Sequence, residues 1–316
     1  MDSLRERIRS FLKVTLPTCS PDVRFIEREA EDGITRSLIS YTAPDGDQIE
    51  AFLFQPEAAK PQAAVLALHQ HNSQWLIGKS EIAGLAGDPL QAFGPALARH
   101  GVMVLAPDAV GFESRLSKAG WGSSLAPSSS KPHSTPEGWL QYYNQMAHRL
   151  VKGDLLLRKI LEDSAAGLSA LETLSGIRNL GVVGHSFGGN TTLFLAALDT
   201  RVIFSCASGS VCSFRHKLRS QTALEMSLII PGFCNHFDFD DLLRCIAPRR
   251  LLVISSQEDP LSADAEDLVR AALPAFEQLN CVAHLQHVRT AAGHALDRER
   301  FNAIIDWCVA RANCPS

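Results

Sequence analysis

The stretch of sequence that decides the fold covers residues 180–198 and reads LGVVGHSFGGNTTLFLAAL. It begins with a short apolar run at 180–183, typical of a buried strand, and ends with a segment of helical character at 189–198. Between them, residues 184–188 match the pattern G-x-S-x-G. In this pattern a serine occupies a strained turn between a strand and a helix, and small neighbours allow the backbone to adopt the turn. We therefore identify Ser186 as the candidate nucleophile.

Short apolar runs alternate with helical segments along the rest of the chain. Buried strands are expected at residues 63–68, 102–106, 180–183, 202–207, 250–255 and 283–288, and helices at 89–99, 189–198 and 298–311. This alternation indicates βαβ units, and it predicts an α/β fold with a mostly parallel sheet and helices on both faces. The β-rich runs 37–41 and 48–54 flank the turn sequence PDGD and predict a hairpin at one edge of that sheet.

We expect a single domain over residues 1–316 with an N-terminal helical extension at 1–34 and two insertions. The insertions, 112–140 and 209–240, do not fit the alternation of strands and helices. Loops this long are usually functional or mobile, so we expect both to roof the active site. The aromatic candidates for its apolar walls are Trp121, Trp139, Tyr142, Phe214 and Phe233.

Charge and composition exclude several classes of protein. The formal net charge of −4 argues against a nucleic-acid partner, because neutralising phosphates requires a basic face. Charges recur through Lys13, so no secretory signal is evident, and no apolar run is long enough for a membrane span. The eight cysteines are scattered without metal-ligand spacing, which favours reduced thiols and a cytoplasmic location. A local disulfide among Cys212, Cys234 and Cys245 stays open, as does the oligomeric state.

A serine nucleophile needs a general base, and the base needs a carboxylate that orients it. Asp259 follows the apolar run 251–254, at the end of a predicted parallel strand, where open sheets place their functional groups. His294 follows the last predicted strand. Glu258 is the alternative acid and His287 the alternative base, although His287 lies within its strand. The chain order of serine, acid and histidine is that of the G-x-S-x-G hydrolases.

The negative charge that develops on an attacked carbonyl needs hydrogen-bond donors. We expect one donor to be the backbone N–H of Phe187, directly after the nucleophile. The second is expected from the loop after the strand at 63–68, where the N–H of His71 is favoured and Gln70 is the alternative. His69 and His71 could also be interpreted as a metal pair, but no third ligand has suitable spacing. We expect neither a metal nor an organic cofactor.

His185, beside the nucleophile, is expected to be a packed residue that points away from the active face. A role in the proton transfer is therefore not assigned to it.

Five stretches together resemble the dienelactone-hydrolase and acetyl-xylan-esterase branch of the α/β-hydrolase superfamily. They are LHQHN at 68–72, KSEIAGLAGDP at 79–89, LAPDAVGF at 105–112, GHSFGG at 184–189 and APRR at 247–250. The resemblance covers nearly the whole chain from about residue 35. It implies an eight-stranded, mostly parallel sheet and a catalytic triad of Ser186, Asp259 and His294.

The chain departs from that branch at three points. Dienelactone hydrolases use a cysteine nucleophile where this chain has Ser186, and the oxyanion loop often reads His-Gly where this chain has His69 and Gln70. Esterases of this kind that act on polysaccharides outside the cell carry export signals, and none is seen here. The resemblance thus implies a serine esterase that cleaves a small intracellular ester through an acyl-enzyme.

Other activities use the same triad. A peptidase or amidase, a thioesterase and a C–C hydrolase are alternatives, although prolyl-oligopeptidase-like enzymes carry an additional large domain for which this chain has no room. A non-catalytic binding protein with the same fold is the alternative from another class. The presence of all three triad residues argues against it, because the loss of one would be expected.

Overall fold

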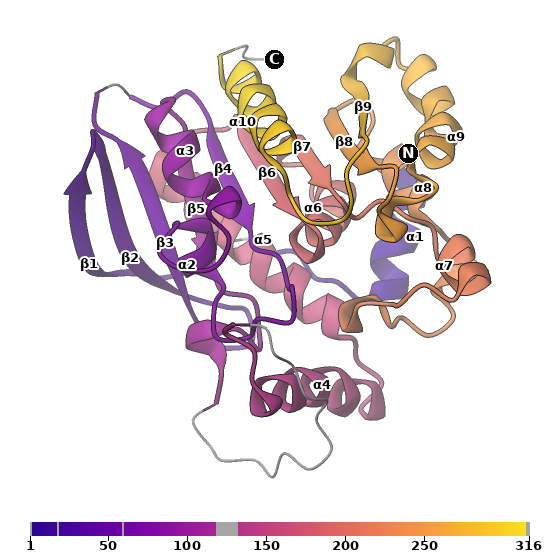
Figure 1. Ribbon diagram of the computed structural model, residues 1–316, viewed down its shortest axis with the longest axis horizontal. Helices are drawn as coiled ribbons and strands as arrows, with labels where there is room; N and C mark the ends of the chain where they lie inside the picture. The colour runs from indigo at the N-terminus through magenta and orange to yellow at the C-terminus, as the bar shows by residue number, and fades with distance from the viewer. Residues whose placement is uncertain (1, 18, 59, 118–131, 314–316) are drawn as a thin grey trace.

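One nine-stranded sheet organises the molecule in the computed structural model, which describes residues 2–17, 19–58, 60–117 and 132–313. The strand order is β1-β2-β3-β5-β4-β6-β7-β8-β9. The pairs from β1 to β5 are antiparallel, and every pair from β5 to β9 is parallel. The predicted mostly parallel α/β fold and the antiparallel hairpin, which is β2–β3, are confirmed, but β1 rather than the hairpin forms the edge of the sheet (Figure 1).

The elements have the following bounds. The strands are β1 (Val23–Glu31), β2 (Ile34–Thr42), β3 (Gln48–Pro56), β4 (Ala64–Leu68), β5 (Met103–Pro107), β6 (Leu180–His185), β7 (Val202–Ser208), β8 (Arg250–Ser256) and β9 (Leu285–Thr290). The α-helices are α1 (Asp2–Leu12), α2 (Lys79–Ile82), α3 (Phe93–Arg99), α4 (Pro136–Val151), α5 (Leu156–Ser175), α6 (Phe187–Leu198), α7 (Phe214–Ser220), α8 (Phe239–Ile246), α9 (Ala265–Glu277) and α10 (Arg298–Ala312). None of the helices within the described ranges is long and apolar enough to cross a membrane.

The edge strand β1 corrects two expectations. The segment 1–34 was expected to be a helical extension and the sheet to have eight strands, but the helix α1 ends at Leu12 and β1 is a ninth strand. All residues of β1 after Val23 are exposed. An edge strand that buries neither face shows no alternation of apolar and polar residues, so the pattern that reveals other strands is absent here.

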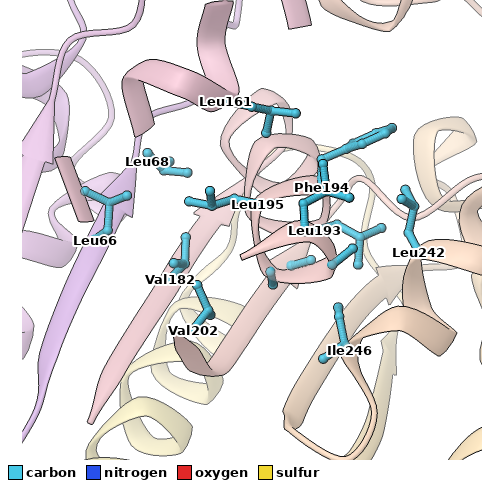
Figure 2. Packing of buried hydrophobic residues seen from close by; sticks show 14 of the residues in the cluster. Leu66, Leu68, Leu161, Val182, Leu193, Phe194, Leu195, Val202, Leu242 and Ile246 are labelled. Atoms are coloured by element: carbon cyan, nitrogen blue, oxygen red, sulfur yellow. The ribbon is translucent and has the colours of Figure 1, made fainter. Parts of the chain in front are cut away.

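Two hydrophobic layers cover the sheet. Apolar residues of α1, α5, α6, α8 and α9 share one core with side chains of the strands, and residues of α3 and α10 form the core of the opposite face. Figure 2 shows the first core around Leu193 and Phe194 of α6, which lie among Leu66, Val182 and Leu242. The sheet therefore has helices on both faces, as strands buried on both faces require.

Helix α6 lies at the centre of the molecule and is buried along all twelve of its residues. It packs against β6 and β7 on one side and against α5 and α8 on the other. A helix that is apolar all round is a buried one, which explains why its sequence lacks an amphipathic stripe. The turn that begins α6 is consequently held by the core.

The described cysteines are free thiols, and Cys212, Cys234 and Cys245 form no disulfide.

Candidate active site

Ser186 forms the turn between β6 and α6. Its backbone has φ 57° and ψ −119°, a conformation that costs a non-glycine residue on the order of 1–3 kcal/mol and that persists only where the surroundings enforce it. Its N–H donates to the carbonyl of Ser208 at 2.8 Å, and its carbonyl accepts from the N–H of Asn190 at 2.9 Å. The strained turn predicted for the nucleophile is therefore present.

Glycines on both sides of Ser186 allow the close approach that this turn requires. A Cβ on Gly188 would lie 2.1 Å from the carbonyl oxygen of Leu68, and a Cβ on Gly184 would lie 2.4 Å from the carbonyl carbon of Gly188. Neither neighbour can move, because both are backbone atoms. The turn is thus locked against the end of β4, where the loop expected to supply an oxyanion donor begins.

The structure brings together the three residues that the sequence singled out. The imidazole of His294 lies with Nε2 2.8 Å from the Oγ of Ser186 and with Nδ1 3.0 Å from Oδ1 of Asp259. Asp259 lies in the loop after β8 and His294 in the loop after β9, at the same edge of the parallel sheet as the turn after β6. The side chain of Asp259 is fully buried, whereas a third of the His294 side chain is exposed.

Asp259 is held as an ionised carboxylate. Burial on its own would raise the pKa of Asp259, but hydrogen bonds from His294, from the N–H of Leu261 and from the Oγ of Ser262 outweigh it and lower that pKa below its ordinary value. The two latter bonds measure 2.9 Å each. An ionised, fixed carboxylate keeps the proton of the imidazole on Nδ1 and leaves Nε2 free to accept one from Ser186.

The competing residues lie elsewhere. Glu258 is exposed, and its backbone N–H donates to the carbonyl of Ala292 at 3.2 Å. His287 lies within β9, and its Nε2 is 2.8 Å from the Oγ of Ser255. Neither alternative is hydrogen-bonded to Ser186 or His294.

The side chain of His185 does not point away from the site as expected. It is fully buried, as expected of a packed residue, but its ring lies against that of His294 with 5.2 Å between centroids rather than away from the site. Burial, together with the nearby His294 and Arg300, lowers the pKa of His185 to about 3. Its Nδ1 lies 3.0 Å from the Oγ of Ser208. The contact therefore places a neutral ring behind the imidazole of His294.

The two residues expected to stabilise an oxyanion lie on neighbouring segments. Phe187 is the first residue of α6, where backbone N–H groups have no acceptor within the helix. His71 lies in the loop after β4, and its ring is 6.4 Å from that of Phe187. The alternative residue, Gln70, turns its side chain to Glu81, with 2.9 Å between Nε2 and Oε1. The assignment of the two N–H donors stays a prediction.

His69 has a structural role in this loop that the sequence did not predict. Its Nε2 accepts from the N–H of Ala109 at 3.1 Å, so Nδ1 carries the proton and donates to the carbonyl of Gln70 at 2.8 Å. Burial lowers the pKa of His69 and favours this neutral form. Within the described ranges no group of three or more histidine, cysteine or acidic side chains is placed to hold a metal. His69 instead fastens the loop after β4 to the end of β5.

A buried ionic cluster holds the same two loops together. The ammonium of Lys79 lies 2.8 Å from carboxylate oxygens of both Asp108 and Glu113. Burial alone would lower the pKa of Lys79, but these two carboxylates outweigh it and raise the pKa above its ordinary value. The carboxylate of Glu113 also accepts from the N–H of Gly78 at 2.8 Å and from the N–H of Ser80 at 3.0 Å.

The two predicted insertions meet near this loop. Tyr142 of α4, just after the segment 112–140, donates from its hydroxyl to Oε1 of Glu225 in the segment 209–240 at 2.6 Å. The ring of Tyr142 lies 5.2 Å from that of His71. The two segments are therefore joined beside the predicted oxyanion loop, and their role as a roof stays a prediction.

The other aromatic candidates for pocket walls fall into three groups. Phe214 and Phe233 belong to the main core, where they pack against aromatic residues of α6 and α8, so their assignment to the walls is wrong. Trp139 stacks on Tyr143 of the same helix at 5.2 Å. Trp121 lies outside the described residues.

Comparison with known proteins identifies the fold. No protein-family model and no curated protein matches the chain. Among solved structures, a protein of Bacteroides fragilis NCTC 9343, named provisionally as an acetyl xylan esterase, is similar with a TM-score of 0.75 and 15% identity, over 97% of this chain and 86% of the other. A glucuronoyl esterase from Solibacter usitatus has a TM-score of 0.66 and 15% identity, over 98% and 92%. An acetyl xylan esterase from Paenibacillus sp. R4 has a TM-score of 0.62 and 16% identity, over 98% and 93%.

Identities this low establish the fold alone. The chain has the α/β-hydrolase fold, as the resemblance implied, with one strand more than expected.

Proposed function

We propose that this chain is a serine esterase that cleaves a small carboxylic ester through an acyl-enzyme intermediate. The observation that carries the proposal is the continuous hydrogen-bonded relay from Asp259 through His294 to Ser186, with distances of 3.0 and 2.8 Å. The serine stands on a strained turn at the carboxyl edge of the sheet, where this fold places its nucleophile. The names of the similar structures, which are those of esterases, support an ester rather than an amide.

The relay defines the roles of the three side chains. His294 accepts the proton of Ser186 on Nε2 while Oγ attacks the ester carbonyl carbon. The resulting oxyanion would accept hydrogen bonds from the N–H groups of Phe187 and His71. His294 then returns the proton to the departing alcohol, which leaves the acyl group on Ser186. A water molecule, deprotonated by the same imidazole, attacks the acyl-enzyme, and the imidazole passes that proton to the departing Oγ of Ser186 as the acid is released.

Asp259 acts through the imidazole. Its carboxylate holds the Nδ1 proton and stabilises the positive charge that His294 carries after each proton transfer. Because its pKa is lowered by His294 and by the donors around it, Asp259 stays ionised when the imidazole becomes positive.

The substrate class we propose is a small carboxylic ester. Structures named for acetyl xylan and for glucuronoyl esters share the fold, so acetylated sugars and methyl esters of uronic acids belong in the substrate panel beside simple esters. The cytoplasmic location expected from the sequence stays a prediction.

The test measures hydrolysis of p-nitrophenyl esters, from acetyl to decanoyl, and labelling by a fluorophosphonate. We expect Ser186→Ala to lower kcat by a factor on the order of 10⁴ or more and to abolish labelling. Ser205→Ala is the matched control, because it removes a fully buried hydroxyl that has no hydrogen-bond partner among the described residues. A wild-type chain that hydrolyses no ester and takes no label would show the proposal to be wrong. Faster cleavage of matched anilides or thioesters would assign the same triad to the alternative activities.

A further inference from the structure

Arg300, near the start of α10, is the largest fully buried side chain in the described ranges. Its guanidinium donates in three directions. Nε donates to Oδ2 of Asp297 at 2.9 Å, Nη1 donates to the Oγ of Ser256 at 2.9 Å, and Nη2 donates to the carbonyl of Ala295. A buried arginine is stable only where its charge is paired and its N–H groups find acceptors. Asp297 caps the helix of Arg300 itself, whereas the other two partners, Ser256 and Ala295, lie beside the proposed catalytic residues.

Each of those two partners belongs to a different catalytic loop. Ser256 is the last residue of β8 and leads directly into the loop that carries Asp259. Ala295 follows His294 in the loop between β9 and α10. The guanidinium therefore spans the loop of the acid and the loop of the base.

A short path through Ser256 and Ser262 connects Arg300 to the carboxylate itself. The N–H of Ser256 donates to the Oγ of Ser262 at 3.3 Å, and that hydroxyl donates to Oδ2 of Asp259 at 2.9 Å. The Oγ of Ser256 also lies 2.9 Å from Oγ1 of Thr290, the last residue of β9. A displacement of Arg300 would thus reach Ser262, whose hydroxyl donates to Oδ2 of Asp259.

The loop of the base is held at several points, one of which is Leu296, buried in the core beside residues of α10. Residues 291–297 contain no helix or strand, and the backbone bond from Glu258 to Ala292 at 3.2 Å ties the loop before His294. After His294, the carbonyl of Ala295 is held by Arg300. His294 is also more exposed than Asp259, so its position depends on the backbone on either side.

We propose that Arg300 is a positioning residue. Its guanidinium fixes the separation between the acid-bearing and base-bearing loops, and so keeps His294 within hydrogen-bond distance of Asp259 and Ser186. This inference rests on the proposed function. Arginine suits the task because its planar fork offers five donors in fixed directions, which a lysine ammonium cannot reproduce. A misplacement of about 1 Å from a substitution remote from the chemistry can cost about 10²-fold in rate.

The experiment compares Arg300→Lys with Arg5→Lys. Arg5 is also buried and donates to two carbonyls, those of Ala197 at 3.0 Å and Cys245 at 2.9 Å, but it lies on α1 away from the catalytic loops. Both substitutions keep the positive charge and replace the planar guanidinium, with its several N–H donors, by an ammonium group. We expect Arg300→Lys to lower kcat and the rate of fluorophosphonate labelling by about 10- to 100-fold with KM changed less than about twofold. Arg5→Lys should lower Tm without changing kcat.

Two readouts separate positioning from stability. In proton NMR spectra the downfield resonance of the His294 Nδ1 proton, bonded to Asp259, should broaden or disappear in Arg300→Lys and persist in Arg5→Lys. Ethylguanidine added to folded Arg300→Ala should restore part of the labelling rate, and should not change that of Arg5→Ala. If Arg300→Lys does not fold, Ser256→Ala removes one acceptor of the fork and should show the same effects to a smaller degree.

The outcomes also distinguish this inference from the proposed function. If the wild type is labelled and Arg300→Lys matches Arg5→Lys in kcat with its downfield resonance intact, Arg300 has no positioning role and the esterase proposal stands. If the wild type neither hydrolyses esters nor takes the label, the esterase proposal is wrong. The NMR comparison then still tests whether Arg300 sets the contact between His294 and Asp259.

Discussion

The loops on the two sides of Ser186 are held in different ways. On one side of β6 in the sheet, the loop after β4 is fastened by side chains that carry or bind charge: Lys79 with Asp108 and Glu113, and Gln70 with the buried Glu81. On the other side, the loops after β8 and β9 are joined through hydroxyls and backbone groups. The guanidinium of Arg300 is buried there and is paired with Asp297.

The difference follows from what each side does in the proposed reaction. An oxyanion donor has only to stay in place, so buried charges can fix its loop, provided that they are paired. The base must change its protonation state, and every unbalanced charge nearby would shift the pKa at which it does so. Neutral hydroxyls can hold the loops of Asp259 and His294 in place without adding such a charge. Three substitutions test this comparison.

The largest effect is expected on the base side. Asp259→Asn should lower kcat by a factor of about 10⁴, because the amide cannot hold the productive tautomer of His294. Glu258→Gln is the matched control, since Glu258 is the adjacent but exposed acid. Kinetics with p-nitrophenyl acetate check both variants. Retained activity in Asp259→Asn beside lost activity in Glu258→Gln would make Glu258 the acid.

The oxyanion side should show its largest effect in stability. Lys79→Met leaves the buried Asp108 and the half-buried Glu113 without their cation, which should lower the free energy of unfolding by about 3–5 kcal/mol. Arg270→Met is the control, because Arg270 also makes two ion pairs, at 2.9 and 3.1 Å, but is exposed. It should cost less than about 1 kcal/mol. Urea denaturation measures both variants. Equal losses in the free energy of unfolding would show that the burial of the Lys79 cluster does not make its ion pairs more important for stability than exposed ones.

The smallest effect concerns Glu81 and pH. Burial, opposed only in part by hydrogen bonds from Gln70 and Asp88, raises the pKa of Glu81 from 4.5 to about 7. The unfolded chain loses this proton at a lower pH than the folded chain. The contribution of Glu81 to the free energy of unfolding is therefore complete below its pKa in the unfolded chain, and it declines as the pH rises to its pKa in the folded chain. The decline is at most roughly 3 kcal/mol.

Glu81→Gln should remove that decline, because its amide oxygen can still accept from Gln70. Between about pH 5 and about pH 8 the variant should lose roughly 1–3 kcal/mol less stability than the wild type in urea denaturation. Glu277→Gln, at an exposed position, should follow the wild type. Parallel pH profiles for the wild type and Glu81→Gln would show that Glu81 ionises in the folded chain as it does in the unfolded one.

Local patterns were sufficient for the central part of the molecule. The apolar runs, the hairpin and the strand–turn–helix around Ser186 follow from hydrophobicity and turn chemistry, which act between neighbours in the chain. Edge strand β1 escaped detection because it buries almost nothing. Phe214 and Phe233 were misplaced because an aromatic residue in a long irregular segment looks the same whether it lines a pocket or enters the core.

By itself, the sequence determined the α/β class, the turn at Ser186 and the candidates Asp259 and His294, since each follows a strand end that its own neighbours define. Only the tertiary structure decided how these groups are held. Arg300 is 44 residues from Ser256, and Lys79 is 29 residues from Asp108. Both are charged residues in segments whose sequence is also compatible with an exposed helix or loop. Their burial and their partners are apparent only in the folded chain, where the sheet brings distant loops to one edge.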